Sequence, residues 1–106
     1  MNNNFKINQR QVPKSGEIFL DHIAWFVPNI SLASKTFDRL GFTLTPFVAQ
    51  TNLNPSGGLP IPAGTGNRCA MLRRGYLEVL TTVVGEETTP LARQLINSVE
   101  RYTGVH

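Results

Sequence analysis

The sequence predicts an α+β fold: a single β-α-β-β-β module with a four-stranded mixed sheet, followed by a C-terminal helix. Three observations lead to this prediction. The length of 106 residues fits about one small domain. Four apolar segments are rich in β-branched and aromatic residues, and two other segments carry apolar residues at helical spacing. Nine glycines and seven prolines indicate many turns between short elements.

The first strand is expected within a dense apolar run near the start of the chain. Residues 1–16, which end in Pro-Lys-Ser-Gly, are polar and aperiodic and predict a flexible leader. The module is expected to span 17–84. Its first strand is the run Ile18–Val27, which Pro28 ends. The run is apolar enough to predict a strand covered on both faces, interrupted by Asp21 and His22.

A short amphipathic helix is expected next. Asn29 or Ser31 can cap its first free N–H groups, and Gly41 is suited to end it. The apolar face follows the spacing i, i+4, i+7 and consists of Ala33, Phe37 and Leu40. A strand-helix-strand unit makes a right-handed crossover, so this helix should cover one face of the sheet.

Three further strands and a second helix complete the predicted module. The strands are expected at 42–49, 67–73 and 76–84, with Arg74-Gly75 as a hairpin turn. Residues 51–64 contain three prolines and three glycines, which predicts an exposed loop. In the C-terminal segment 85–106, Thr89-Pro90 opens a helix that Gly104 ends. Its apolar face is predicted to consist of Leu91, Leu95, Ile96, Val99 and Tyr102.

Alternation along the strands assigns side chains to the two faces of the sheet. His22 and Phe26 share one face, and the bulkier apolar set around Trp25 forms the face that the first helix covers. In the last strand, Tyr76 and Glu78 share a face. We expect the face that carries His22 to have no cover within this chain, so it needs a second module or a partner.

His22 and Glu78 are the candidate metal ligands. Neutral imidazole and carboxylate are common ligands of divalent metal ions, and both side chains are expected on one sheet face. The alternative is a hydrogen-bonded, half-buried His22 and an exposed Glu78 without a ligand role. Two ligands make an incomplete set, so a second copy or a second half of the protein would have to supply the others.

Four segments, in order, resemble the glyoxalase-like branch of the vicinal oxygen chelate superfamily: Leu20–Asn29, Leu40–Pro46, Gly64–Arg68 and Gly75–Leu80. The resemblance covers about residues 17–84. It implies paired modules whose sheets enclose a cavity, with a His of the first strand and a Glu of the fourth as metal ligands in the enzymatic members. His22 and Glu78 occupy those positions.

The resemblance implies an enzyme of the lyase, isomerase or dioxygenase type that acts on a small oxygenated metabolite. Its cofactor would be a divalent metal ion such as Zn, Ni, Mn or Fe. The superfamily also includes metal-free binding proteins, so a metal-free module that binds or sequesters a small molecule is the alternative. The chain offers one module where many relatives continue into a second. It is therefore expected to be a homodimer or the N-terminal half of a longer protein.

Four residues are candidate substrate contacts, and each has an ordinary structural alternative. Phe26 and Tyr76 can line the cavity or serve only in packing, and Asn67 can contact substrate or fix the turn into its strand. Arg68 stands where comparable relatives commonly have a His or a small residue. It either faces solvent or binds an anionic substrate group. Gln50 is a weaker candidate for a neutral ligand or a substrate contact. Cys69 is expected to pack in the core.

Charge and composition argue against several other classes of protein. The net charge of +3 is scattered, with Arg73-Arg74 as the one adjacent basic pair, whereas nucleic-acid binding needs clustered basic residues. No apolar stretch approaches the ~20 residues of a membrane span. A single cysteine cannot form an intrachain disulfide, and with no secretory signal visible the protein is expected in the cytoplasm.

Overall fold

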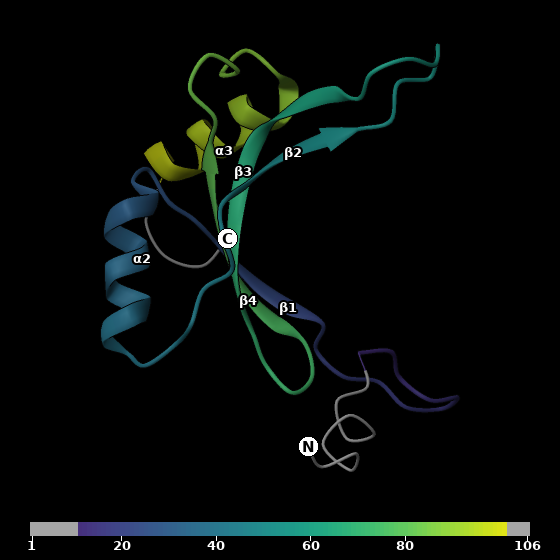
Figure 1. Cartoon of the computed structure of the whole chain (residues 1–106), viewed down its shortest axis with the longest axis vertical. Coiled ribbons are helices and arrows are strands. Elements are labelled where there is room, and N and C mark those ends of the chain that lie inside the picture. The colour runs from purple at the N-terminus through teal and green to yellow at the C-terminus, as the bar shows by residue number, and fades with distance from the viewer. Residues whose placement is uncertain (1–10, 102–106) are drawn as a thin grey trace.

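The computed structural model describes residues 11–101. In this range the elements follow in the order β1 (His22–Phe26), α2 (Ile30–Arg39), β2 (Val48–Asn52), β3 (Ile61–Met71), β4 (Tyr76–Thr82) and α3 (Pro90–Arg101) (Figure 1). The strands form one sheet in the order β1-β4-β3-β2, in which β1 runs parallel to β4 and the other neighbours are antiparallel. This mixed sheet and its helices confirm the predicted α+β fold and the β-α-β-β-β order.

Helix α2 begins and ends at the residues that its sequence indicates. Of the two predicted caps, Asn29 is the one used, because its side chain accepts a hydrogen bond from the Leu32 N–H at 3.0 Å. Gly41 follows the helix with a φ of 92°, a backbone conformation that glycine adopts without steric cost. Phe37 packs edge-on against Trp25 of β1, with 5.7 Å between the ring centroids. Leu40, expected on the apolar face, lies beyond the last turn and is 69% exposed.

Strand β1 is shorter than predicted. It starts at His22, whereas the sequence predicted a strand covered on both faces from Ile18 onward, and Ile18 is 94% exposed. The reason lies in the partner strand, since β4 begins at Tyr76, which pairs with His22. Residues before His22 therefore have no strand beside them.

The boundaries of β2 and β3 also differ from the prediction. Of the strand expected at 42–49, residues 42–47 contain only an isolated bridge from Leu44 to Ala70. β2 starts at Val48, beyond Pro46, which has no N–H to donate. The expected loop at 51–64 is partly strand, because β3 begins at Ile61 despite Pro62. Since β4 pairs with β3 only from Thr65 onward, the side of β3 away from β2 is unpaired at Pro62, and proline is tolerated at such an open edge.

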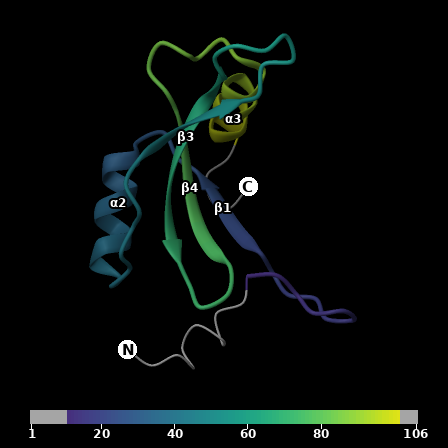
Figure 2. The same cartoon turned by 45° about the vertical axis from the view of Figure 1, so that its right-hand side comes forward.

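The two helices lie on opposite faces of the sheet (Figure 2). α2 covers the predicted face around Trp25, whereas α3 packs over one end of the face that carries Glu78. The expectation that this second face has no cover within the chain is therefore wrong for that end. Thr89 anchors α3 there, because its hydroxyl donates to Ala63 O at 2.8 Å and accepts from the Ala92 N–H at 3.2 Å.

The core of the described chain is small. Its buried apolar side chains are Ala63, Ala70, Val79, Ala92 and Leu95. No helix within residues 11–101 is long and apolar enough to cross a membrane.

The last residues of the predicted leader contact the β3–β4 turn. Residues 11–16 contain no helix or strand. Gln11 nevertheless donates to Arg73 O at 2.9 Å and accepts from the Gly75 N–H at 2.8 Å. The predictions for residues 1–10, Tyr102 and Gly104 fall outside the described residues.

Candidate functional site

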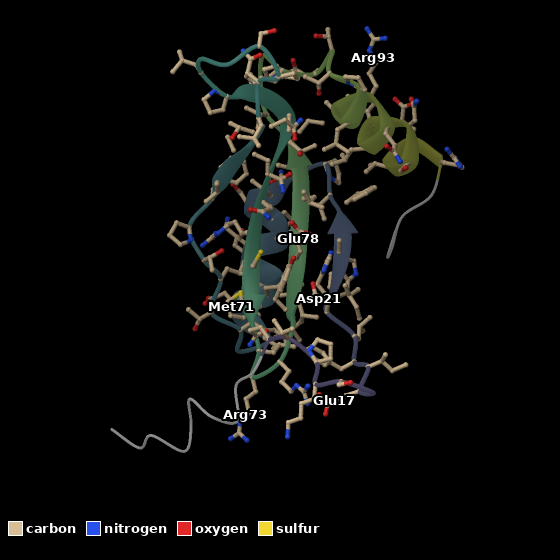
Figure 3. The ribbon with its side chains drawn as sticks, turned by 90° about the vertical axis from the view of Figure 1, so that its right-hand side faces the viewer. Glu17, Asp21, Met71, Arg73, Glu78 and Arg93 are labelled. Carbon is tan, nitrogen blue, oxygen red and sulfur yellow. The ribbon has the colours of Figure 1, made fainter. Side chains whose placement is uncertain are left out.

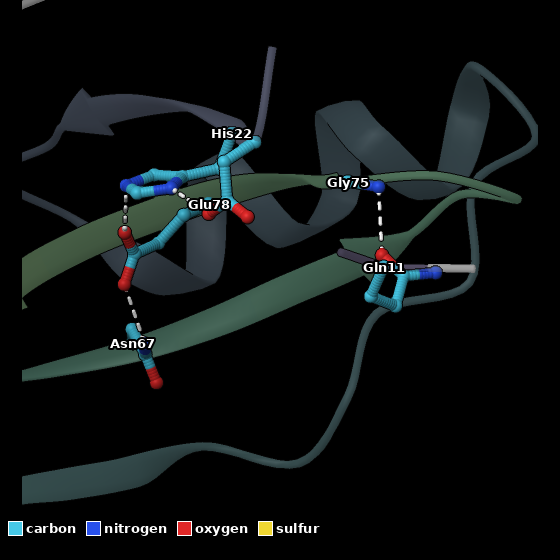
Figure 4. Close-up of polar contacts among 6 residues, drawn as sticks. Gln11, His22, Asn67, Gly75 and Glu78 are labelled. Carbon is cyan, nitrogen blue, oxygen red and sulfur yellow. Dashed lines mark hydrogen bonds and ion pairs between the residues drawn. The ribbon is translucent and has the colours of Figure 1, made fainter. Parts of the chain in front are cut away.

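His22 and Glu78 lie on one face of the sheet, on the neighbouring strands β1 and β4. Glu78 pairs with Ala24, and His22 pairs with Tyr76, so the two side chains are offset by one two-residue step along the same face. His22 Nε2 lies 3.9 Å from Glu78 Oε1 (Figure 4). Figure 3 shows this face toward the viewer, with Glu78 near the middle of the sheet. The alternation of side chains along the strands thus predicted correctly that His22 and Glu78 share a face of the sheet.

The imidazole of His22 is held by two neighbours. Its Nδ1 lies 2.7 Å from Asp21 Oδ2, and its ring stacks on Tyr76 with 4.7 Å between the centroids and an angle of 4° between the planes. In neutral His22, a proton on Nδ1 satisfies Asp21 and leaves the lone pair on Nε2, the nitrogen that faces Glu78. A carboxylate behind a histidine is the usual way to orient a metal-ligating imidazole.

Glu78 is a buried carboxylate, which overturns the alternative of an exposed surface charge. Its side chain is 8% exposed, and Asn67 Nδ2 donates to its Oε2 at 2.5 Å. Asn67 lies within β3 opposite Leu80, so its alternative role in the turn before the strand is also wrong. The amide fixes one carboxylate oxygen, and the other oxygen faces His22.

Two further side chains near Glu78 stay protonated at neutral pH. Burial and, second, the Glu78 carboxylate raise the pKa of the Cys69 thiol. Burial, followed by Glu78 and then Asp21, raises the pKa of Tyr76. Glu78 and Asp21 therefore supply the negative charge of this face beside neutral thiol and phenol groups, which favours a cation there.

A pocket of about 200 Å³ extends from Glu78 to the underside of α3. Its walls combine apolar side chains of the sheet and the helix with the amides of two glutamines. Gln50 is fixed in it, because the Thr65 hydroxyl donates to its Oε1 at 2.5 Å. The lining residues are Phe26, Gln50, Thr65, Glu78, Leu80, Leu91, Gln94 and Leu95.

The structure brings together most of the predicted site residues. Phe26 lines the pocket, Asn67 binds Glu78, and Tyr76 stacks on His22. Arg68 does not join them. It pairs with Val79, so it points to the opposite face, where it donates to Thr45 O and Ser34 Oγ.

Sequence reasoning missed Asp21 and the part of α3 that roofs the pocket. In the predicted strand, alternation places Asp21 on the face opposite His22. The structure starts β1 at His22, so Asp21 lies before the strand and its carboxylate reaches the His22 ring. The position of Leu91, Gln94 and Leu95 depends on how the chain leaves β4, which no local pattern encodes.

The donors His22 Nε2 and Glu78 Oε1 fit a divalent metal ion of borderline softness, for which mixed nitrogen and oxygen ligands are usual. Their separation of 3.9 Å is about half an ångström above the ~3.4 Å between ligand atoms bound tetrahedrally at ~2.1 Å. Within residues 11–101, no three His, Cys, Asp or Glu side chains gather closely enough to hold a metal ion. The described chain thus brings together two candidate ligands, fewer than a metal site needs.

Comparison with protein families gives a match over most of the chain. A family model described as a glyoxalase-like domain matches residues 20–106. Comparisons with curated proteins and with solved structures gave no significant match. The family match agrees with the resemblance seen in the sequence.

Proposed function

This chain belongs to the family of glyoxalase-like domains, and from that premise we propose that it is a metal-dependent enzyme acting on a small oxygenated metabolite. The reaction would be of the lyase, isomerase or dioxygenase type. His22 and Glu78 would hold a divalent ion such as Zn, Ni, Mn or Fe. The protein is proposed to work in the cytoplasm.

The observation that carries this proposal is the buried carboxylate of Glu78 facing the free nitrogen of an oriented imidazole. Burying a carboxylate is costly unless it is paired, and within the described chain Glu78 has the Asn67 amide and the His22 ring as partners. A bound cation would compensate this charge better than either.

The residues around the pair have positioning roles in the proposed site. Asp21 holds the proton on His22 Nδ1, and Asn67 holds Glu78 Oε2, so both donor atoms are directed to one point. When bound, the metal would supply Lewis-acid stabilisation of an oxyanion on the substrate. The pocket beneath α3 begins at Glu78 and would receive the rest of the substrate, with Phe26 and Leu80 on its floor.

We propose that a second module or a second copy of this chain completes the ligand set. Protein metal sites of this kind use three or four ligands, and the described chain brings two together. The end of the sheet face near His22 is not roofed by α3 and carries Met71, which is 57% exposed. Pairing through that end would add ligands and cover apolar surface together.

Metal binding in solution tests the proposal. Metal-stripped protein would be titrated with Zn²⁺, Ni²⁺, Mn²⁺ and Fe²⁺ in a calorimeter, with wild type compared to His22→Ala and Glu78→Gln. We expect both variants to bind at least tenfold more weakly, and Glu100→Gln, which removes an exposed carboxylate of α3, to bind like wild type. Equal binding by all four proteins would refute the assignment of His22 and Glu78 as ligands.

A metal-free binding module is the second candidate, and the apolar walls of the pocket favour it. Phe26, Leu80, Leu91 and Leu95 enclose a space that needs no metal to hold an apolar ligand. Thermal stabilisation by small molecules in excess chelator distinguishes the two functions, because a metal enzyme loses that stabilisation on chelation and a metal-free module keeps it.

A further inference from the structure

A second cavity lies on the sheet face opposite Glu78. Its volume is about 370 Å³, and it is formed between α2, the segment 42–44 that leads toward β2, and β3. Arg68 projects from β3 into its lining, together with Ser34, Lys35 and Asp38 of α2. Because Arg68 and Glu78 point to opposite faces, this cavity is separate from the proposed metal site.

The guanidinium of Arg68 is fixed in place. Its Nε donates to Thr45 O at 2.8 Å, and its Nη1 donates to Ser34 Oγ at 2.9 Å. The Ser34 hydroxyl in turn donates to Ile30 O at 2.7 Å, so the acceptor is itself held. An arginine has five N–H donors, and two of them bond to described residues, which leaves three without a partner in that part of the chain.

Arg68 is a half-buried cation that forms no ion pair among the described residues, although the exposed Asp38 lines the same cavity. In the part of the chain that the structure describes, no carboxylate forms an ion pair with the Arg68 guanidinium. A partly buried charge without a counter-charge is unfavourable, so a ligand that supplies one is stabilised there.

The other walls of the cavity suit a small anionic molecule. Lys35 adds a second positive charge, and Asp38 subtracts one, which leaves the lining positive. Phe42 and Leu44 offer apolar contact, and Thr43 offers a hydroxyl. From this arrangement we propose that the cavity is a second ligand site that binds the oxyanion group, phosphate or carboxylate, of a small molecule, with Arg68 as its principal donor.

A purely structural Arg68, which only ties α2 to residue 45, is the competing explanation. The two differ in what the free N–H groups do. A structural arginine leaves them to water, whereas a ligand-binding arginine shows saturable contact with an oxyanion.

Nitrogen-edited NMR titration of the full chain separates these explanations. Inorganic phosphate and succinate would be added in separate titrations at constant ionic strength, with sodium chloride as the reference salt. We expect saturable shifts of the Arg68 Nε–Hε signal and of the amides of residues 34–45, and the tighter of the two probes identifies the ligand class. Shifts that match those with chloride, or that spread over all exposed basic residues, would overturn the proposal.

Three variants give the titration its controls. Arg68→Lys keeps the charge but loses the fork, and we expect about tenfold weaker binding. Lys35→Gln alters an exposed residue without touching the packing, and we expect roughly threefold weaker binding even if Arg68→Lys fails to fold. Arg93→Gln removes an exposed arginine of α3 and should bind like wild type. If Lys35→Gln and Arg68→Lys both bind phosphate and succinate as tightly as wild type, the proposed anion site is wrong. The outcome of this titration is independent of metal binding at His22.

Discussion

Replacing Glu78 with Gln should separate the effect of this carboxylate on function from its effect on stability. The substitution preserves the shape of the side chain and the acceptor oxygen for Asn67, and it removes the charge. A carboxylate that is 8% exposed loses several kcal/mol of hydration, of which one charge-assisted hydrogen bond returns about 1.5–3 kcal/mol. We therefore expect metal-free Glu78→Gln to match wild type in free energy of unfolding, or to exceed it by up to about 2 kcal/mol.

Added metal should reverse the order of the two free energies of unfolding and make wild type more stable than Glu78→Gln. At a free metal concentration of 100 Kd, wild type gains about 2.7 kcal/mol, whereas the variant lacks one of the two ligands and gains little. Urea unfolding followed by Trp25 fluorescence, in chelator and in excess Zn²⁺, measures both differences. For a domain of this size, 1 kcal/mol corresponds to roughly 4–8 °C in Tm.

The result that refutes this reasoning is a metal-free variant less stable than wild type by more than about 1 kcal/mol. Glu78 would then be a structural partner of Asn67, retained for the fold. Glu100→Gln, which changes an exposed carboxylate of α3, is the matched control and should leave both stabilities within about 0.5 kcal/mol of wild type.

Three other predictions test the fold around the two sites. Gly75→Ala should lower the free energy of unfolding, measured in urea, by roughly 1–3 kcal/mol, because Gly75 has a φ of 76° and an added Cβ would overlap Asp21 O. Gly57→Ala is the control: its φ is 80° but the space around it is open, so its free energy of unfolding should fall by less. Thr89→Ala should lower the free energy of unfolding by about 1–2 kcal/mol in the same assay, since it removes the cap of α3 and the hydrogen bond to Ala63 O. Thr88→Ala, at an exposed position, should leave the free energy of unfolding unchanged. Hydrogen bonds from the Gly85 N–H and, second, from the N–H of Glu87 itself lower the pKa of the Glu87 carboxyl. The ionised carboxylate therefore stabilises the fold at pH values above the unfolded-state pKa. This contribution is lost as the pH falls through the folded-state pKa. Carbon-detected NMR titration should give the Glu87 carboxyl a midpoint below that of a glutamate in an unfolded peptide, and an equal midpoint would contradict the hydrogen bond.

Alternation explains why much of the site could be predicted from the sequence. Where a strand is regular, its side chains follow a period of two, so His22 with Phe26 and Tyr76 with Glu78 could each be assigned to a face. The predicted strand boundaries were wrong where a partner strand decides how far a strand extends. The start of β4 at Tyr76 fixes where β1 begins, and the short pairing of β4 with β3 allows Pro62 inside β3. Such limits depend on contacts between segments that are distant in the sequence.

The helix that roofs the pocket could not be placed from the sequence for a related reason. The apolar spacing of Leu91 and Leu95 predicts a helix with one buried side, but it does not say which sheet face that side meets. That choice is made by the chain after β4, where the Val83 N–H donates to Gly64 O at 2.9 Å and Thr89 binds Ala63 O. The first contact extends the pairing of β4 with β3 by one residue, and the second holds the start of α3 to β3, at the end of the sheet where Phe26 and Leu80 lie.

The register of β3 links the proposed metal site to the proposed anion site. Asn67 and Arg68 are adjacent, and their side chains point to opposite faces, one to Glu78 and the other to the cavity beside α2. A shift of β3 by one residue would bring Arg68 to the face of Glu78 and remove Asn67 from it. The guanidinium would then neutralise the carboxylate that the metal needs, and the cavity beside α2 would lose its cation. The strand pairing that keeps Arg68 opposite Val79 is therefore needed for both proposed sites, and a variant that slips this register should lose metal binding and anion binding together.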